Sequence, residues 1–150
     1  MMSADCLDCY RSYMMYHQDP INRLIHVICI PGISWSLCAL LPPLHSLLLV
    51  AFYDILYLYL FVVHLCHLEP ITFFKLSFFL ASIWVSASLF RAVVPFYEII
   101  AWVTFGLCWI MQFIGHALFE GNHPAFLDSI HQSFLMAPLF AYFEVEDLII

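Results

Sequence analysis

The stretch LIHVICIPGISWSLCALLPPLHSLLLVAFY, residues 24–53, contains no Asp, Glu, Lys or Arg. A helix that crosses a bilayer needs roughly 20 mostly apolar residues, so this stretch is too long for one span alone. Pro42 and Pro43 divide it, because proline is strongly disfavoured inside a helix. We therefore predict a first spanning helix from Leu24 to about Leu41 and a turn after it. A chain with this stretch crosses the membrane more than once.

More apolar runs follow the double proline. They predict a second helix over residues 46–68, a third over 71–90 and a fourth over 99–119. Residues 125–143 are also long enough to span, but they carry a polar stripe and Pro138. We predict a fifth helix there that is re-entrant or interfacial, with spanning as the alternative. The expected fold is all-α, a polytopic membrane bundle of four transmembrane helices and this fifth helix.

The composition agrees with a membrane protein. The chain is 65% hydrophobic and 10% charged, with a mean hydropathy of +0.96, whereas soluble domains average about half apolar and about a quarter charged. Four basic residues against eleven acidic ones give a net charge of −7, which argues against a nucleic-acid partner and leaves membrane lipid as the expected surroundings. We expect one membrane-embedded domain over residues 1–150, with residues 1–12 as a mobile terminus.

The few basic residues predict an orientation. Placing the N-terminus in the cytosol puts Arg11, Arg23 and Lys75 on the cytosolic side and Arg91 on the opposite side. The positive-inside rule favours this arrangement.

Histidine is unexpectedly frequent for so apolar a chain, with eight residues. Asp19 and Pro20 are typical of a helix start, and Asn22 and His26 then lie one turn apart on the same face. His17 precedes that start and can fold back over it. A histidine inside a membrane span is costly and usually functional, although a single one is often a packing residue.

A second polar cluster closes the fourth predicted helix. Gln112, His116 and Glu120 follow one another at intervals of four residues, and Gly115 permits close approach of a neighbouring helix. Four crossings return the chain to its starting side, so His26 and His116 can meet at one membrane face. The two clusters then bring together three imidazoles, including that of His17, and one carboxylate. Such a set suits Fe(II) and O2 chemistry, but zinc with three histidines is equally compatible.

The remaining histidines and cysteines give weaker signals. His64 and His67 could add ligands, but packing at the membrane interface is favoured for them. His45 is expected to be solvated, and roles for His123 and His131 near the site stay open. Cys6 and Cys9 form a lone CxxC pair, a weak signal for a metal or redox site.

Several motifs together resemble one known family. The residues that carry the resemblance are Tyr16-His17, Pro20, Asn22, His26, Ile30-Pro31, Gln112-Phe113, Gly115-His116, Phe119-Glu120, Pro124-Ala125, Asp128, Gln132, Ala137-Pro138, Phe140 and Glu144. They resemble the small endoplasmic-reticulum 2-hydroxy-fatty-acid dioxygenases that act in phytosphingosine degradation. The resemblance covers residues 13–144, and its specific motifs lie at the two ends of that range.

This resemblance implies an Fe(II)-dependent α-oxidation in the endoplasmic-reticulum membrane, in which a 2-hydroxy fatty acid and O2 give an acid one carbon shorter. It places the essential, metal-binding histidines at His17, His26 and His116. Glu120 would be a fourth ligand or, slightly favoured, would hydrogen-bond a ligating imidazole. The residues expected to orient the ligands are Asn22, Gln112, Asp128 and Gln132.

Chemistry is consistent with that function. A 2-hydroxy carboxylate can chelate a metal through two oxygens, and its acyl chain would gain roughly 0.8 kcal/mol per buried CH2 between apolar helices. Alternatives are a haem protein with two axial histidines, a zinc protein, and a non-catalytic membrane scaffold. A di-iron desaturase is disfavoured, because the HxxxH and HxxHH boxes of that class do not occur in the sequence.

Overall fold

The fold is helical throughout the part of the chain that the structure, a computed structural model, describes: residues 4–40, 69–121 and 137–145. Its elements are α1 (Ala4–Met14), α2 (Pro20–Leu40), α4 (Pro70–Val93), α5 (Tyr97–Gly115), the π-helix η1 (His116–Glu120) and a C-terminal helix over residues 137–145. These described ranges contain no β-strand. The all-α fold expected from the sequence is confirmed.

Three described helices are long and apolar enough to cross a membrane: α2, α4, and α5 continued through η1. They correspond to the first, third and fourth predicted spans. The predicted second helix over 46–68 lies outside the described residues, as do residues 125–136 of the fifth predicted helix. Large apolar side chains such as Phe78, Trp102 and Leu118 are exposed along the three spans, as expected for surfaces that face lipid.

The start of α2 follows from its sequence. Asp19 Oδ1 accepts hydrogen bonds from the backbone N–H groups of Ile21 (2.7 Å) and Asn22 (3.4 Å). Asp19 is thus the predicted N-cap, and Pro20 occupies the first helical position, where its missing N–H costs nothing. The helix begins four residues before the apolar stretch, and this start places Asn22 and His26 on one face.

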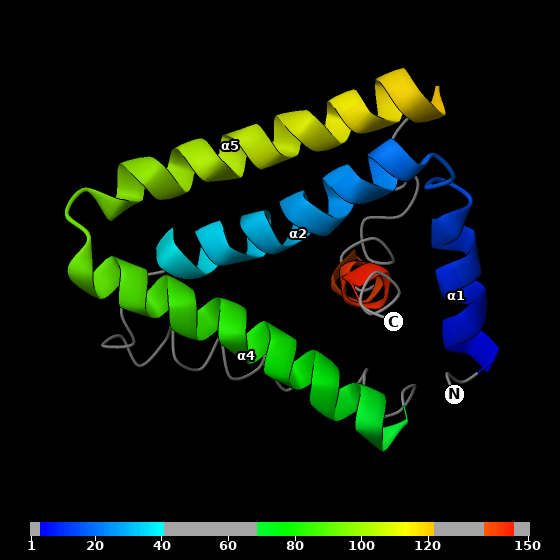
Figure 1. The fold of residues 1–150 in the computed structure, drawn as a ribbon, viewed down its shortest axis with the longest axis horizontal. Helices are drawn as coiled ribbons and strands as arrows, with labels where there is room; N and C mark the ends of the chain where they lie inside the picture. Colours follow the sequence, from blue (N-terminus) through cyan, green and yellow to red (C-terminus); the bar gives the residue numbers. More distant parts are fainter. Residues whose placement is uncertain (1–3, 41–68, 122–136, 146–150) are drawn as a thin grey trace.

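The helices form a wedge (Figure 1). Helices α4 and α5 meet at the short turn between them and diverge from it, and α2 lies between them, antiparallel to α5. The C-terminal helix and α1 lie at the wide end, beside the start of α2 and the end of α5. The wide end therefore gathers segments from both ends of the sequence.

The two ends of the wedge are packed differently. At the narrow end, Ala39, Ala87 and Ala101 form a fully buried cluster that joins α2, α4 and α5. Small side chains allow helix backbones to approach closely. The wide end has a larger core of aromatic and aliphatic side chains: Tyr13, Ile30, Phe73, Leu76, Leu139, Phe140, Ala141 and Tyr142.

Residues 4–14 of the N-terminal segment, which was expected to be mobile, form helix α1. The ring of Tyr10 packs against Phe140 and Phe143 of the C-terminal helix, with centroid distances of 6.4 and 5.6 Å. Tyr13 joins the same core. The partners of this short helix lie about 130 residues away in the chain, and a local reading of the sequence cannot include them.

Candidate metal centre

Three histidines from distant parts of the chain meet at the wide end of the wedge. His17 precedes α2, His26 lies in its second turn, and His116 begins η1. Each ring offers one nitrogen, and these three atoms all lie within 4.8 Å of one another. All three side chains are buried. The convergence predicted from the sequence is confirmed, and we call this set the histidine triad.

The orientation of His17 is fixed from two directions. Its Nδ1–H donates to the Tyr13 carbonyl oxygen at 2.8 Å, and its ring stacks on the Tyr13 ring at a centroid distance of 4.2 Å. A carbonyl oxygen can only accept, so Nδ1 carries the proton and Nε2 keeps its lone pair. Nε2 is buried and has no hydrogen-bond partner among the described residues. This atom is an electron-pair donor without a proton to bind.

Electrostatics keep His17 uncharged. Burial, together with nearby His116 and Arg23 and against the opposing hydrogen bond to Tyr13, lowers the pKa of His17 from 6.5 to about 4. The imidazole is therefore neutral at pH 7. Only the neutral form can donate an electron pair to a metal ion.

His26 is oriented in the same way. Its Nδ1–H donates to the Asn22 carbonyl oxygen at 2.9 Å, one turn back along α2. Its ring centroid lies 4.4 Å from that of His17 and 4.9 Å from that of His116. Backbone carbonyls that hold the second nitrogen of an imidazole are a common support of metal-binding histidines.

The triad passes a simple fit test for a metal ion. Imidazole nitrogens lie about 2.1 Å from a bound ion, so two of them are at most about 4.2 Å apart. The observed distances reach 4.8 Å, so a small side-chain movement would bring the three nitrogens within binding distance of one ion. A bound ion would also give the buried lone pair of His17 Nε2 a partner. The rings are in direct contact with one another, which leaves no gap for a porphyrin between two of them.

Glu120 links the end of η1 to the start of α2 through hydrogen bonds. Its Oε1 accepts a hydrogen bond from Asn22 Nδ2 at 3.0 Å and one from the Asp19 backbone N–H at 2.9 Å. The structure thus places this carboxylate against the start of α2, and among the described residues the cluster of ligand atoms contains the three imidazoles. The sequence favoured a hydrogen bond from Glu120 to a ligating imidazole; the two hydrogen bonds described here go to Asn22 and Asp19 instead, so that role stays a prediction.

The end of α5 is shaped for this contact. Gly115 lies so close to α2 that an added Cβ would be 2.3 Å from Asn22 Oδ1 and 3.3 Å from Ile25 Cδ1. The close approach predicted at this glycine is therefore present. The chain then forms the π-helix η1, an element often found at functional sites, which ends at Gly121 with a φ of 65°. Only glycine adopts this backbone conformation without strain.

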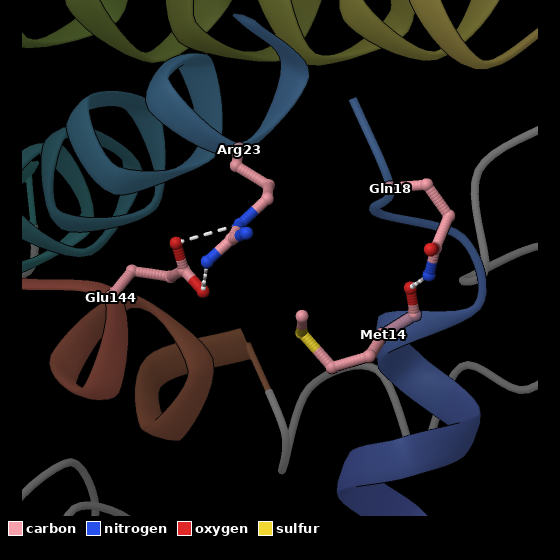
Figure 2. Close-up of polar contacts among 4 residues, drawn as sticks. All are labelled: Met14, Gln18, Arg23 and Glu144. Carbon is pink, nitrogen blue, oxygen red and sulfur yellow. Dashed lines mark hydrogen bonds and ion pairs between the residues drawn. The ribbon is translucent and has the colours of Figure 1, made fainter. Parts of the chain in front are cut away.

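A second set of residues at the site was not foreseen as functional. Phe140 of the C-terminal helix is fully buried, and its ring centroid lies 5.0 Å from that of His17 and 6.5 Å from that of His26. This helix is fastened to α2 by Arg23, whose Nε and Nη2 donate to the two carboxylate oxygens of Glu144 at 2.8 and 2.6 Å (Figure 2). In the loop before α2, Gln18 Nε2 donates to the carbonyl oxygen of Met14, the last residue of α1.

The sequence contained a signal for this packing of the C-terminal helix against the triad. Phe140 and Glu144 belong to the motifs that carry the family resemblance, but their distance from the histidines along the chain hid their position. Arg23 was read only as an orientation signal. In the structure, the Arg23 guanidinium forms a bidentate ion pair with the carboxylate of Glu144. The Glu144 side chain is only 7% exposed.

The other predicted residues divide into two groups. Gln112 lies one turn before His116 on α5, and its Nε2 is buried without a hydrogen-bond partner among the described residues. Asp128, Gln132, His123 and His131 lie outside the described residues, as do His45, His64 and His67.

Comparison with known proteins agrees with this geometry. A family model described as "2-hydroxy-palmitic acid dioxygenase Mpo1-like" matches residues 3–148. The 2-hydroxy-palmitic acid dioxygenase MPO1 of Saccharomyces cerevisiae is 33% identical over 135 residues, which cover 88% of this chain and 74% of the yeast protein. No solved structure matches the chain significantly. The chain belongs to the Mpo1-like family of 2-hydroxy-palmitic acid dioxygenases.

Proposed function

We propose that the protein is an Fe(II)-dependent dioxygenase that removes one carbon from 2-hydroxy fatty acids in the membrane. The single observation that carries the proposal is the buried histidine triad, in which three ligand atoms lie within 4.8 Å of one another. The similarity to the yeast enzyme supports the substrate class. Dioxygenase membership and metal-binding geometry thus support the same reaction type.

Each part of the site has a role in this proposal. His17, His26 and His116 would hold the ion, with the Nδ1–H groups of His17 and His26 anchored on backbone carbonyls. When bound, Fe(II) would supply the activation of O2 and a binding position for the 2-hydroxy acid. Asn22 and Glu120 hold the start of α2 against the end of η1. This contact keeps the histidines of the two segments together.

In this proposal, the aromatic residues packed on the triad exclude water from it. Phe140 and Tyr13 are buried against the rings of the triad. A dry site strengthens electrostatic interactions and limits side reactions of activated oxygen. The ion pair of Arg23 and Glu144 fastens the helix that carries Phe140.

The lipid environment suits the substrate. The triad lies at the start of α2 and the end of α5, two apolar helices long enough to cross a membrane, so a polar head could reach it while the acyl chain stays among apolar side chains or lipid. Relative to water, burial contributes roughly 0.8 kcal/mol per CH2, so a chain of sixteen carbons keeps the substrate in this apolar environment. We further propose the endoplasmic reticulum as the location, the cytosolic side for the triad, and sphingoid-base degradation as the source of the substrate.

The test is turnover by purified protein in detergent or nanodiscs. Protein loaded anaerobically with Fe(II) is given 2-hydroxyhexadecanoic acid and O2, and products are identified by mass spectrometry. We expect pentadecanoic acid with consumption of O2. Protein that retains its helical spectrum and its iron but forms no shortened acid would overturn the proposal. Zinc-loaded protein is the control, since zinc has no redox chemistry.

A further inference from the structure

Two amide atoms beside the triad are buried without hydrogen-bond partners. They are Asn22 Oδ1, an acceptor, and Gln112 Nε2, a donor, and neither has a partner among the described residues. The Asn22 side chain is fully buried. A buried polar atom without a partner destabilises the folded state, so such atoms call for an explanation.

The orientation of the Asn22 amide is not arbitrary. Its Nδ2 donates to the Glu120 carboxylate at 3.0 Å. Turning the amide over would place its oxygen against that carboxylate, where two acceptors would repel each other. The hydrogen bond therefore holds the amide with Oδ1 pointing away from Glu120.

The two atoms come from α2 and α5, the helices that carry His26 and lead to His116. Asn22 Oδ1 lies beside Gly115, close enough that a Cβ there would be 2.3 Å from it. Gln112 precedes Gly115 by three residues on the same face, a rise of about 4.5 Å along the helix. Asn22 is also one turn from His26, and Gln112 is one turn from His116. The donor and the acceptor thus flank the triad.

We propose that these two amides recognise the head group of the substrate, with Gln112 Nε2 donating to the carboxylate and Asn22 Oδ1 accepting from the 2-hydroxyl group. A 2-hydroxy acid carries an acceptor and a donor on adjacent carbons, which complements the pair. This inference rests on the proposed function and adds the residues that select the substrate. Each amide atom gains the partner that it lacks in the described structure.

The pairing predicts a form of selectivity that chelation alone does not. A 2-methoxy acid keeps both oxygens but has no hydroxyl proton, so it leaves Asn22 Oδ1 unsatisfied. Sites built to hydrogen-bond a substrate hydroxyl reject analogues that lack it far more strongly than apolar pockets do. We expect the protein to bind the hydroxy acid at least about tenfold more tightly than the methoxy acid.

The experiment measures equilibrium binding of 2-hydroxyhexadecanoate and 2-methoxyhexadecanoate to Fe(II)-loaded protein in nanodiscs without O2. Asn22→Leu should reduce the preference for the hydroxy acid about tenfold, toward equal binding. Gln112→Met should weaken both acids about tenfold and leave their ratio unchanged. Met111→Leu, at the exposed neighbouring position, is the matched control.

The outcomes separate the two proposals. A wild-type preference in Asn22→Leu, at wild-type iron content, would overturn the role of Asn22. If Asn22→Leu does not fold, Gln112→Met decides, since Gln112 Nε2 makes no described hydrogen bond that the change could remove; wild-type affinity in that variant overturns the inference. Failure of the wild-type protein to shorten its substrate, with the binding differences present, counts against the proposed function alone.

Discussion

The two ends of the wedge use opposite means to hold helices together. At the narrow end, three buried alanines let α2, α4 and α5 approach closely, with no ionisable group among them. At the wide end, buried polar side chains gather: three histidines, Asn22 and Glu144. Burial of polar groups is costly in a membrane protein. The difference indicates that the narrow end is built for stability and the wide end for chemistry.

Substitutions at the two ends should therefore affect different quantities. A change at the wide end should reduce metal binding and turnover more than stability. A change at the narrow end should do the reverse. Four substitutions and one control, Gly106→Ala, test this comparison.

The largest expected effect is at His26. His26→Ala removes one of three ligand atoms, so turnover should fall by about a thousandfold or more and iron content should drop. Turnover and metal content per folded chain are the measurements. Loss of the folded protein together with activity would instead favour the non-catalytic scaffold, in which the histidines serve packing.

Gly115→Ala should have the next largest effect. The new methyl group would collide with Asn22 Oδ1. This would displace the side-chain amide that contacts Glu120 and disturb the residue whose backbone carbonyl orients His26. Disturbing residues that support metal ligands typically costs about 10- to 100-fold in metal affinity or activity. Iron affinity of the purified variant is the measurement.

A matched glycine on the same helix gives the control. An added Cβ at Gly106 would meet no atom within 4 Å. Gly106→Ala should keep full activity and gain up to about 1 kcal/mol of stability from its higher helix propensity. Equal losses in both variants would show that flexibility of α5, and not the contact at Asn22, sets the iron affinity.

Ala101→Leu tests the narrow end. Ala101 is fully buried among α2 and α4, and a larger side chain should cost about 1–3 kcal/mol of stability through overpacking. The midpoint of thermal unfolding should fall, while iron bound per folded chain stays at the wild-type value. A loss of iron at temperatures where the variant remains folded would contradict the separation of the two ends.

The smallest expected effect is at the ion pair of Arg23 and Glu144. Glu144→Gln removes the charge but keeps the shape, and the Arg23 side chain is 34% exposed and can be solvated. We expect a loss of about 1 kcal/mol and faster proteolysis at the C-terminal helix. A double-mutant cycle with Arg23→Gln measures the coupling. Zero coupling would mean that the aromatic contacts alone hold this helix.

The sequence predicted the helices and the triad because both depend on simple rules. Apolar runs, two of them uncharged, predicted the three described spans, and the expected even number of crossings predicted His26 and His116 at one face. Asp19 and Pro20 identified the start of α2, and the loop before it allowed His17 to join. These inferences use local patterns and the order of segments along the chain, which the sequence contains directly.

The remaining features depend on side-chain contacts between distant segments. Helix α1 is stabilised by rings of the C-terminal helix, and the closure by Phe140 needs the ion pair of Arg23 with Glu144. The position of Glu120 depends on η1, whose wider turn directs side chains differently from an α-helix. None of these contacts has a spacing along the chain that a local pattern could detect.

The most direct test is the metal content of a variant in which His17, His26 and His116 are all replaced by Gln. Iron per chain is measured beside wild type after identical anaerobic loading and desalting, with circular dichroism to verify the helices. We predict about one iron per wild-type chain and almost none in the triple variant at equal helical content. An unchanged iron content in the folded triple variant would contradict a metal centre formed by these three imidazoles.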